Sequence, residues 1–165
     1  MTSEVLAGRV YQINISNGGV PKWPVPSAWV TYLGIEGDRH RSPGHGGPER
    51  ALCLFSLEVI RLLQAEGHPI VPGAAGENLT LEGLDFAALH PGDRLRIGDA
   101  VLIELTRHTT PCVNIAGCFK DGDFTRILQT KFPGHSRMYA RVLQEGEIVT
   151  GDPVYLVSRT AQTEG

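Results

Sequence analysis

Short segments of alternating or continuous apolar character run along the chain and predict β-strands. Within residues 8–16, Ile13 and Ile15 alternate with polar residues, at the period of a strand with one buried face. Similar apolar, β-branched or aromatic stretches follow in chain order at 28–35, 51–55, 78–81, 94–97, 100–106, 138–143, 147–149 and 154–157. A Gly-Asp pair at 98–99 is typical of a two-residue hairpin turn. The pattern therefore predicts a chain made mainly of short antiparallel strands.

Helical periodicity is found in two further segments. After the apolar run 51–55, Ser56 is a good N-cap residue, apolar side chains recur at helical spacing, and Gly67 ends the pattern. Residues 123–131 form a second amphipathic candidate. Twenty glycines and eleven prolines, scattered over the whole chain, indicate many turns between short elements. We therefore predict a mainly β protein, a closed antiparallel β-barrel with inserted helices.

Composition narrows the classes of function. The 165 residues are the size of one ordinary domain, so we expect a single domain over residues 1–165. A formal charge of -3 argues against nucleic-acid partners, and no apolar run is long enough to span a membrane. The N-terminus has neither signal-peptide nor transit-peptide character. With only three cysteines, a disulfide framework is excluded, and we expect a soluble cytoplasmic protein.

Cys112 stands in the context that best supports thiol chemistry. Thr110 is a good N-cap and Pro111 a good first helical residue, which predicts Cys112 in the first turn of a short helix after a strand. Amide dipoles there, together with Arg107 and His108 upstream, would favour the thiolate, the form that acts as nucleophile or soft-metal ligand. From spacing alone, a small buried structural cysteine is the alternative.

The other two cysteines lack that context. Cys53 lies inside an apolar strand, and Cys118 has no cationic neighbour before Lys120. We expect both to be structural.

A glycine-rich segment provides a second group of candidates. Gly46 and Gly47 permit positive φ and close backbone approach to a ligand, while His45 and Arg50 carry donors for an anionic group. A turn-rich connection with solvated charges is the alternative.

Polar side chains later in the chain form two smaller candidates. Asn78 and Thr80 could bind a polar ligand or serve only the local backbone. Arg137, Tyr139 and Arg141 alternate along one predicted strand and so share a face, either a cationic wall for phosphate or a solvated edge.

Six short motifs, taken in order, resemble the MOSC family, the domain named after the C-terminal part of molybdenum-cofactor sulfurase. They are GIEGD at 34–38, HGGPERAL at 45–52, GENLT at 76–80, PGDRLRIG at 91–98, PC at 111–112 and RVLQEG at 141–146. Each is common alone, and the order makes the set specific. The chain departs from the family where members often carry Pro-Arg shortly before the cysteine, because residues 107–111 read RHTTP.

The resemblance implies a barrel of the MOSC type and a cysteine, here Cys112, that ligates molybdenum or carries sulfur toward it. The soft, anionic, phosphate-bearing cofactor needs a thiolate, cations and hydrogen-bond donors. The residues expected to bind it are His45, Gly46, Gly47, Arg50, Asn78, Thr80, Arg107, Arg137 and Arg141. Pyridoxal phosphate is associated with full-length sulfurases, but Lys22, Lys120 and Lys131 stand in no recognisable Schiff-base motif, so we do not expect it on this chain.

Two classes of function follow from the resemblance. Stand-alone bacterial members include a reductase of N-hydroxylated nucleobases and related compounds. Since the chain has no haem, flavin or iron–sulfur motif, a reductase of this kind would take electrons from separate electron-transfer proteins. The alternative is a carrier that receives a persulfide on Cys112 from a sulfur donor.

Two further hypotheses for the role of Cys112 remain. In a thiol hydrolase, Cys112 would pair with His108, His45 or His40 as the base. A zinc site is the other, although the chain lacks the paired-cysteine spacing of closed structural zinc sites.

Overall fold

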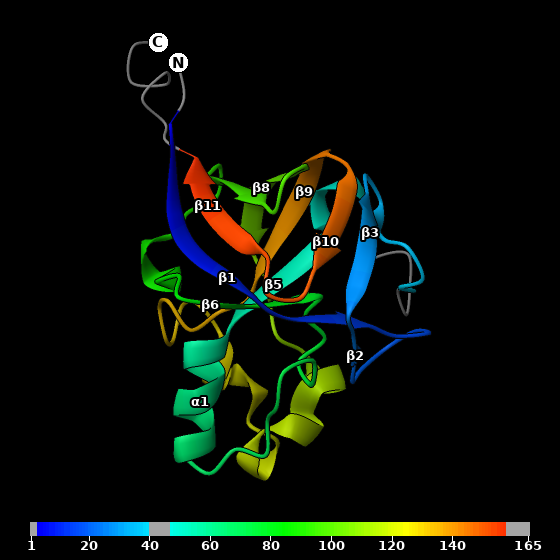
Figure 1. The fold of residues 1–165 in the computed structure, drawn as a ribbon. Coiled ribbons are helices and arrows are strands. Elements are labelled where there is room, and N and C mark those ends of the chain that lie inside the picture. The colour runs from blue at the N-terminus through cyan, green and yellow to red at the C-terminus, as the bar shows by residue number, and fades with distance from the viewer. Residues whose placement is uncertain (1–2, 40–46, 158–165) are drawn as a thin grey trace.

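The protein is a closed β-barrel with a helical layer on one side (Figure 1). A computed structural model describes residues 3–39 and 47–157. Seven strands follow one another around the barrel in the order β1 (Glu4–Ile15), β11 (Pro153–Val157), β7 (Arg94–Ile97), β8 (Val101–His108), β9 (Met138–Gln144), β5 (Leu52–Ser56) and β6 (Leu79–Glu82), and β6 pairs with β1 again. The predicted closed barrel is confirmed.

The barrel is mixed rather than wholly antiparallel. Among its neighbouring strands, β5 and β6 run parallel while the other pairs are antiparallel. The parallel pair follows from the connection, because the chain leaves β5 through a helix and a long loop before it enters β6, and parallel neighbours need such a crossover.

Smaller strands extend this framework. β2 (Trp23–Val25) pairs with β1 at the edge of the main sheet, and the pattern analysis did not predict it. A separate sheet has the order β10 (Gly146–Val149), β3 (Ser27–Thr31), β4 (Gly34–Ile35). The predicted strand 28–35 is thus two strands with a turn between them.

The α-helix predicted after Ser56 is confirmed as α1 (Leu57–Ala65). The Ser56 hydroxyl accepts a hydrogen bond from the Val59 amide at 3.1 Å, which caps the helix. The other helical pieces are short 3-10 helices: η2 (Pro48–Arg50), η3 (Phe86–Ala88), η4 (Val113–Cys118), η5 (Lys120–Gly122) and η6 (Phe124–Ile127). No helix in the described residues is long and apolar enough to cross a membrane.

The predicted helix over 123–131 is wrong. The segment contains only η6, after which Leu128 returns to an extended conformation. Tertiary contacts explain the difference. Ile127 is buried in a core, and the neighbouring Arg126 is also buried and donates two hydrogen bonds to the carboxylate of Glu66, the C-cap residue of α1. A continuous amphipathic helix, with apolar residues on one face and charged residues in solvent, would not bury both side chains.

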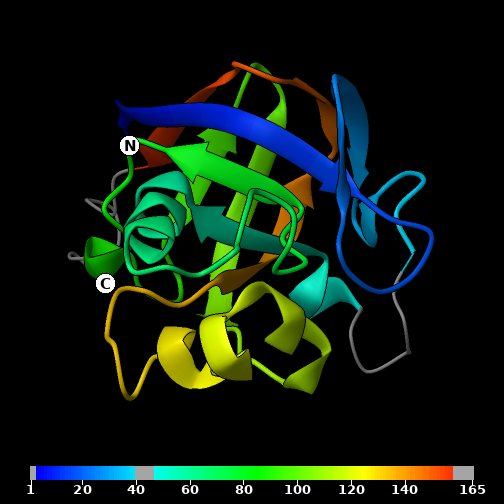
Figure 2. The ribbon, with the colours of Figure 1, turned by 90° about the horizontal axis from the view of Figure 1, so that it is seen from below.

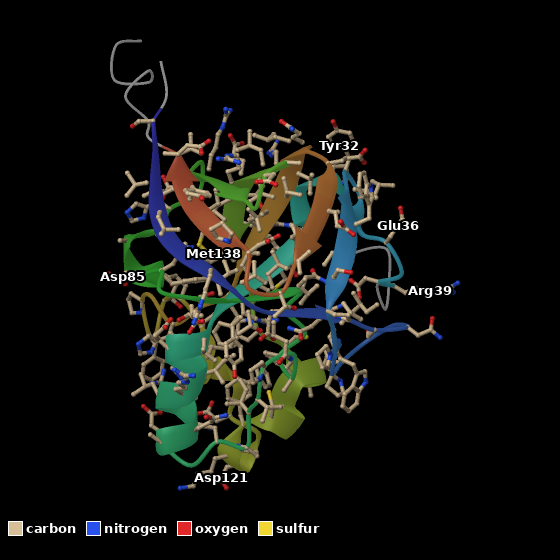
Figure 3. All side chains as sticks on the ribbon, viewed as in Figure 1. Tyr32, Glu36, Arg39, Asp85, Asp121 and Met138 are labelled. Atoms are coloured by element: carbon tan, nitrogen blue, oxygen red, sulfur yellow. The ribbon has the colours of Figure 1, made fainter. Side chains whose placement is uncertain are left out.

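Two hydrophobic cores lie on opposite sides of the barrel wall. Leu52 and Leu54 of β5 point into the barrel, as does Met138 of β9 (Figure 3), whereas Phe55 belongs to an outer core. That outer core packs α1, η4 and η6 against the wall, and Figure 2 shows these helices together across one side of the barrel. The alternation along β5 also turns Cys53 outward.

Candidate functional site

A cavity of about 390 Å³ lies against the outer face of the barrel wall, beside the outer core. Its lining comes from segments far apart in the sequence. They are the loop that leads into β2, Arg39 in the segment after β4, Arg50 at the end of η2, β5, the 75–78 loop, β8 with the segment that follows it, and β9. The site is therefore assembled by the barrel and not by any single motif.

Strand register builds the back wall of the cavity. Cys53 on β5 lies opposite Tyr139 on β9, and Tyr139 lies opposite Arg107 on β8. Directly paired residues project to the same face, so these three side chains form one row. A bulge that inserts Thr106 between two paired positions keeps Arg107 on the outer face. The guanidinium of Arg50 lies 5.5 Å from the centroid of the Tyr139 ring.

Cys112 is exposed at this cavity, and its thiol is free. The helix starts two residues later than predicted, because Cys112 and not Thr110 is the N-cap of η4, with φ -142° and ψ 175°. The reason is that the Thr109 amide donates to the Arg137 carbonyl at 2.9 Å, which continues the extended pairing beyond the end of β8. The predicted capping role of Thr110 is therefore wrong.

The two remaining cysteines are buried, as expected. Burial raises the pKa of the Cys53 thiol, whose sulfur lies 3.8 Å from the Thr109 hydroxyl. Burial also raises the pKa of Cys118 to about 11, and its sulfur donates to the Ile115 carbonyl at 3.2 Å. Both thiols are thus kept protonated at neutral pH, although Cys53 reaches the cavity wall.

Arg137 places a buried cation in the cavity wall. Only 6% of its surface is exposed, and one terminal nitrogen donates to the Ala75 carbonyl at 2.7 Å. Its Nε is buried and has no hydrogen-bond partner in the described part of the chain. Burial raises the pKa of the neighbouring Glu77, which disfavours the carboxylate that would otherwise compensate the charge.

A buried ion pair supports another part of the cavity lining. Asp38 accepts hydrogen bonds from the Lys22 ammonium at 2.7 Å, the Ser16 amide at 2.9 Å and the Asn78 side chain at 2.9 Å. The Asn78 oxygen in turn accepts from the Cys53 amide at 3.0 Å. Asn78 therefore lines the cavity, and its side-chain hydrogen bonds connect its own segment to those of Asp38 and Cys53.

Cations dominate the cavity although the chain as a whole is negative. Neither Asp nor Glu lines it among the described residues. Its positively charged lining residues are Lys22, Arg39, Arg50, Arg107 and Arg137. Arg39 is labelled on the loop after β4 in Figure 3. Burial lowers the pKa of His108, so this lining residue is neutral at pH 7 rather than the cation that the sequence suggested.

Not every residue expected at the site reaches the cavity. Thr80 is buried away from it and donates to Glu77 at 2.9 Å, and Arg141 pairs with Glu49 at 3.1 Å. Gly47 precedes η2 with φ 102° and does not line the cavity, while His45 and Gly46 lie outside the described residues.

Sequence reasoning did not propose Lys22 or Arg39 as ligand-binding residues, and it placed Tyr139 only on the strand face shared by Arg137 and Arg141. Asp38 stands in the GIEGD motif, which was the available signal for the Lys22 ion pair. The described residues contain no group of three or more His, Cys, Asp or Glu side chains able to hold a metal ion.

A family model described as MOSC domain matches residues 41–155. This chain belongs to the MOSC family. It is 33% identical to YflK of Bacillus subtilis over 144 residues, which cover 86% of this chain and 64% of YflK. It is 30% identical to YiiM of Escherichia coli over 168 residues, with 92% and 74% covered. A Gibberella moniliformis protein named reductase is 34% identical over 136 residues, which cover 79% of this chain but only 24% of that protein.

Solved structures have the same MOSC-type fold. The structure of YiiM from Geobacillus stearothermophilus has a TM-score of 0.70 at 28% identity and covers 92% of this chain and 76% of that one. YUAD of Bacillus subtilis has a TM-score of 0.73 at 18% identity, with 97% of this chain and all of YUAD covered, and supports the fold alone.

Proposed function

We propose that this MOSC protein is a molybdenum-cofactor-dependent reductase of N-hydroxylated compounds, with Cys112 as the protein ligand to molybdenum. The observation that carries the proposal is the combination of one exposed thiol with a cavity lined by cations and by no described carboxylate. The relative named reductase and the family's association with the molybdenum cofactor support the same class of function.

The residues of the cavity fit such a cofactor. When bound, it supplies a soft metal that takes up and passes on electron pairs, on an anionic pterin that carries a phosphate. The unpartnered Nε of Arg137 is a buried donor that needs an acceptor, and a phosphate oxygen is suited to it. Arg50 and Arg107 add positive charge, and Cys112 adds the single accessible sulfur ligand.

The chain's own residues would then bind, orient and shield the reacting groups. The Cys112 thiol gives up its proton on binding metal, as any thiolate ligand must. Lys22, which is paired with Asp38, fixes one side of the cavity. The buried Cys53 places a protonated, unreactive thiol in the back wall of the cavity. Electrons would come from a separate electron-transfer protein.

A sulfur-carrier function is the second candidate, and one specific observation favours it. Of the three cysteines, Cys112 alone is exposed, so a persulfide would form on a single thiol. In that case the cavity would receive a cofactor from another protein instead of holding its own.

Metal analysis after anaerobic purification separates these functions. We expect near-stoichiometric molybdenum and pterin in the wild type and in Cys118→Ala, the matched control, and neither in Cys112→Ala. Protein without metal or pterin, with one added sulfur on Cys112 after incubation with a sulfur donor, would overturn the reductase in favour of the carrier.

A further inference from the structure

Tyr139 is a polar group in the cavity wall to which metal and anion binding assign no role. Its side chain is half-buried in the middle of the wall row, between Cys53 and Arg107. Its hydroxyl takes part in none of the hydrogen bonds that join the described residues, and Tyr139 lines the cavity. Arg50 covers the ring with its guanidinium 5.5 Å from the centroid, which restricts the orientation of the phenol.

The surroundings of Tyr139 keep the proton on its hydroxyl and place two guanidinium groups near it. Burial raises the pKa of Tyr139, and Cys53 and Cys112 act in the same direction, while Arg137 and Arg107 act in the opposite one. The hydroxyl therefore keeps its proton at neutral pH. The two guanidinium groups lie close enough to stabilise the phenolate that forms when the proton leaves.

We propose that the Tyr139 hydroxyl donates a proton to the oxygen that leaves when an N-hydroxylated substrate is reduced. The inference rests on the proposed reductase function. The N–O bond breaks as two electrons from a separate reductant enter it. The hydroxyl oxygen takes one proton from Tyr139 and leaves as water, and the nitrogen takes a second proton from solvent. The phenolate then regains its proton from solvent.

Two tyrosines allow a matched test. Tyr139→Phe removes only the hydroxyl and keeps the ring under Arg50. Tyr155→Phe is the control, because Tyr155 on β11 also lies beneath an arginine, with the Arg96 guanidinium 4.9 Å from its ring, but outside the cavity. Reduced methyl viologen supplies the electrons. The probes are an N-hydroxylated cytosine and its O-acetyl ester, whose leaving group is acetate and needs no proton.

We expect Tyr139→Phe to slow kcat for the N-hydroxylated probe by about 100-fold, the usual contribution of a general acid, and to keep the wild-type rate with the O-acetyl ester. Calorimetric binding of the N-hydroxylated probe should weaken by about tenfold at most, since one neutral hydrogen bond is lost. Tyr155→Phe should match the wild type with both probes.

Three results would overturn this account, and they are distinguishable. Equal slowing with both probes would make Tyr139 a structural residue. Full activity of Tyr139→Phe in protein with wild-type molybdenum content would remove Tyr139 from the reaction and leave the reductase intact. A wild type without molybdenum would overturn the reductase function itself, and the Tyr139 proposal with it.

Discussion

The two ends of the 3-10 helix η4 carry cysteines in opposite environments. Cys112 precedes the helix, is extended and exposed, and faces the cationic cavity. Cys118 ends the helix, is buried in the outer core and donates its S–H to Ile115. Because a 3-10 helix repeats every three residues, a helical Cys112 would fall in the same row as Ile115 and Cys118 and would face the core. Its extended conformation breaks that row. The difference shows that the late start of the helix is what gives the chain an accessible thiol.

The largest expected difference is in the rates at which the Cys112 and Cys118 thiols are alkylated. With a pKa of about 11, Cys118 is about one-thousandth thiolate at pH 8, and burial slows its reaction further. We expect iodoacetamide to label Cys112 of the cofactor-free protein at least about 100-fold faster than Cys118, measured by peptide mass spectrometry. Labelling of Cys118 should accelerate as the pH rises toward 11, because its thiolate fraction grows.

Unfolding provides the control for the alkylation experiment. In urea the two cysteines should react at similar rates, because the burial that separates them is lost. Equal rates in the folded protein would contradict the contrast between the two ends of η4.

Substitutions on the two faces of η4 should differ in their effect on the free energy of unfolding, and this difference should be smaller than the difference in alkylation rates. Ile115 is buried in the outer core, whereas Val113 is 73% exposed. We expect Ile115→Ala to lower the free energy of unfolding by about 2 to 5 kcal/mol and Val113→Ala to change it by less than about 0.5 kcal/mol, measured by urea denaturation. Similar losses in both variants would mean that η4 does not pack as described.

The barrel could be predicted from sequence because its strands carry a local signal. Period-two patterning and the Ser56 cap are properties of neighbouring residues, and they located the barrel strands and α1. β2 was not predicted because it contains Pro24, and proline is uncommon in strands; it is tolerated here because β2 lies at a sheet edge. The segment after Asp123 was wrongly predicted as a helix because the position of Arg126 depends on its ion pair with Glu66, which is distant in the sequence.

The site was predictable where a motif or a short local pattern marked it. The family motifs pointed to Cys112, Arg50 and Asn78, which line the cavity. Arg107 was expected from its place before Cys112, but its direction depends on a bulge, and Lys22 is held by Asp38, sixteen residues along the chain. Neither relation has a periodic signal in the sequence, so a single sequence cannot reveal it.

X-ray absorption at molybdenum tests the central claim most directly, namely that Cys112 is a ligand to the metal. The comparison is between the wild type and Cys112→Ser, each purified anaerobically, with Cys118→Ala as the control. The account predicts one fewer sulfur neighbour at molybdenum in Cys112→Ser than in the other two proteins. The same number of sulfur neighbours in all three would contradict it.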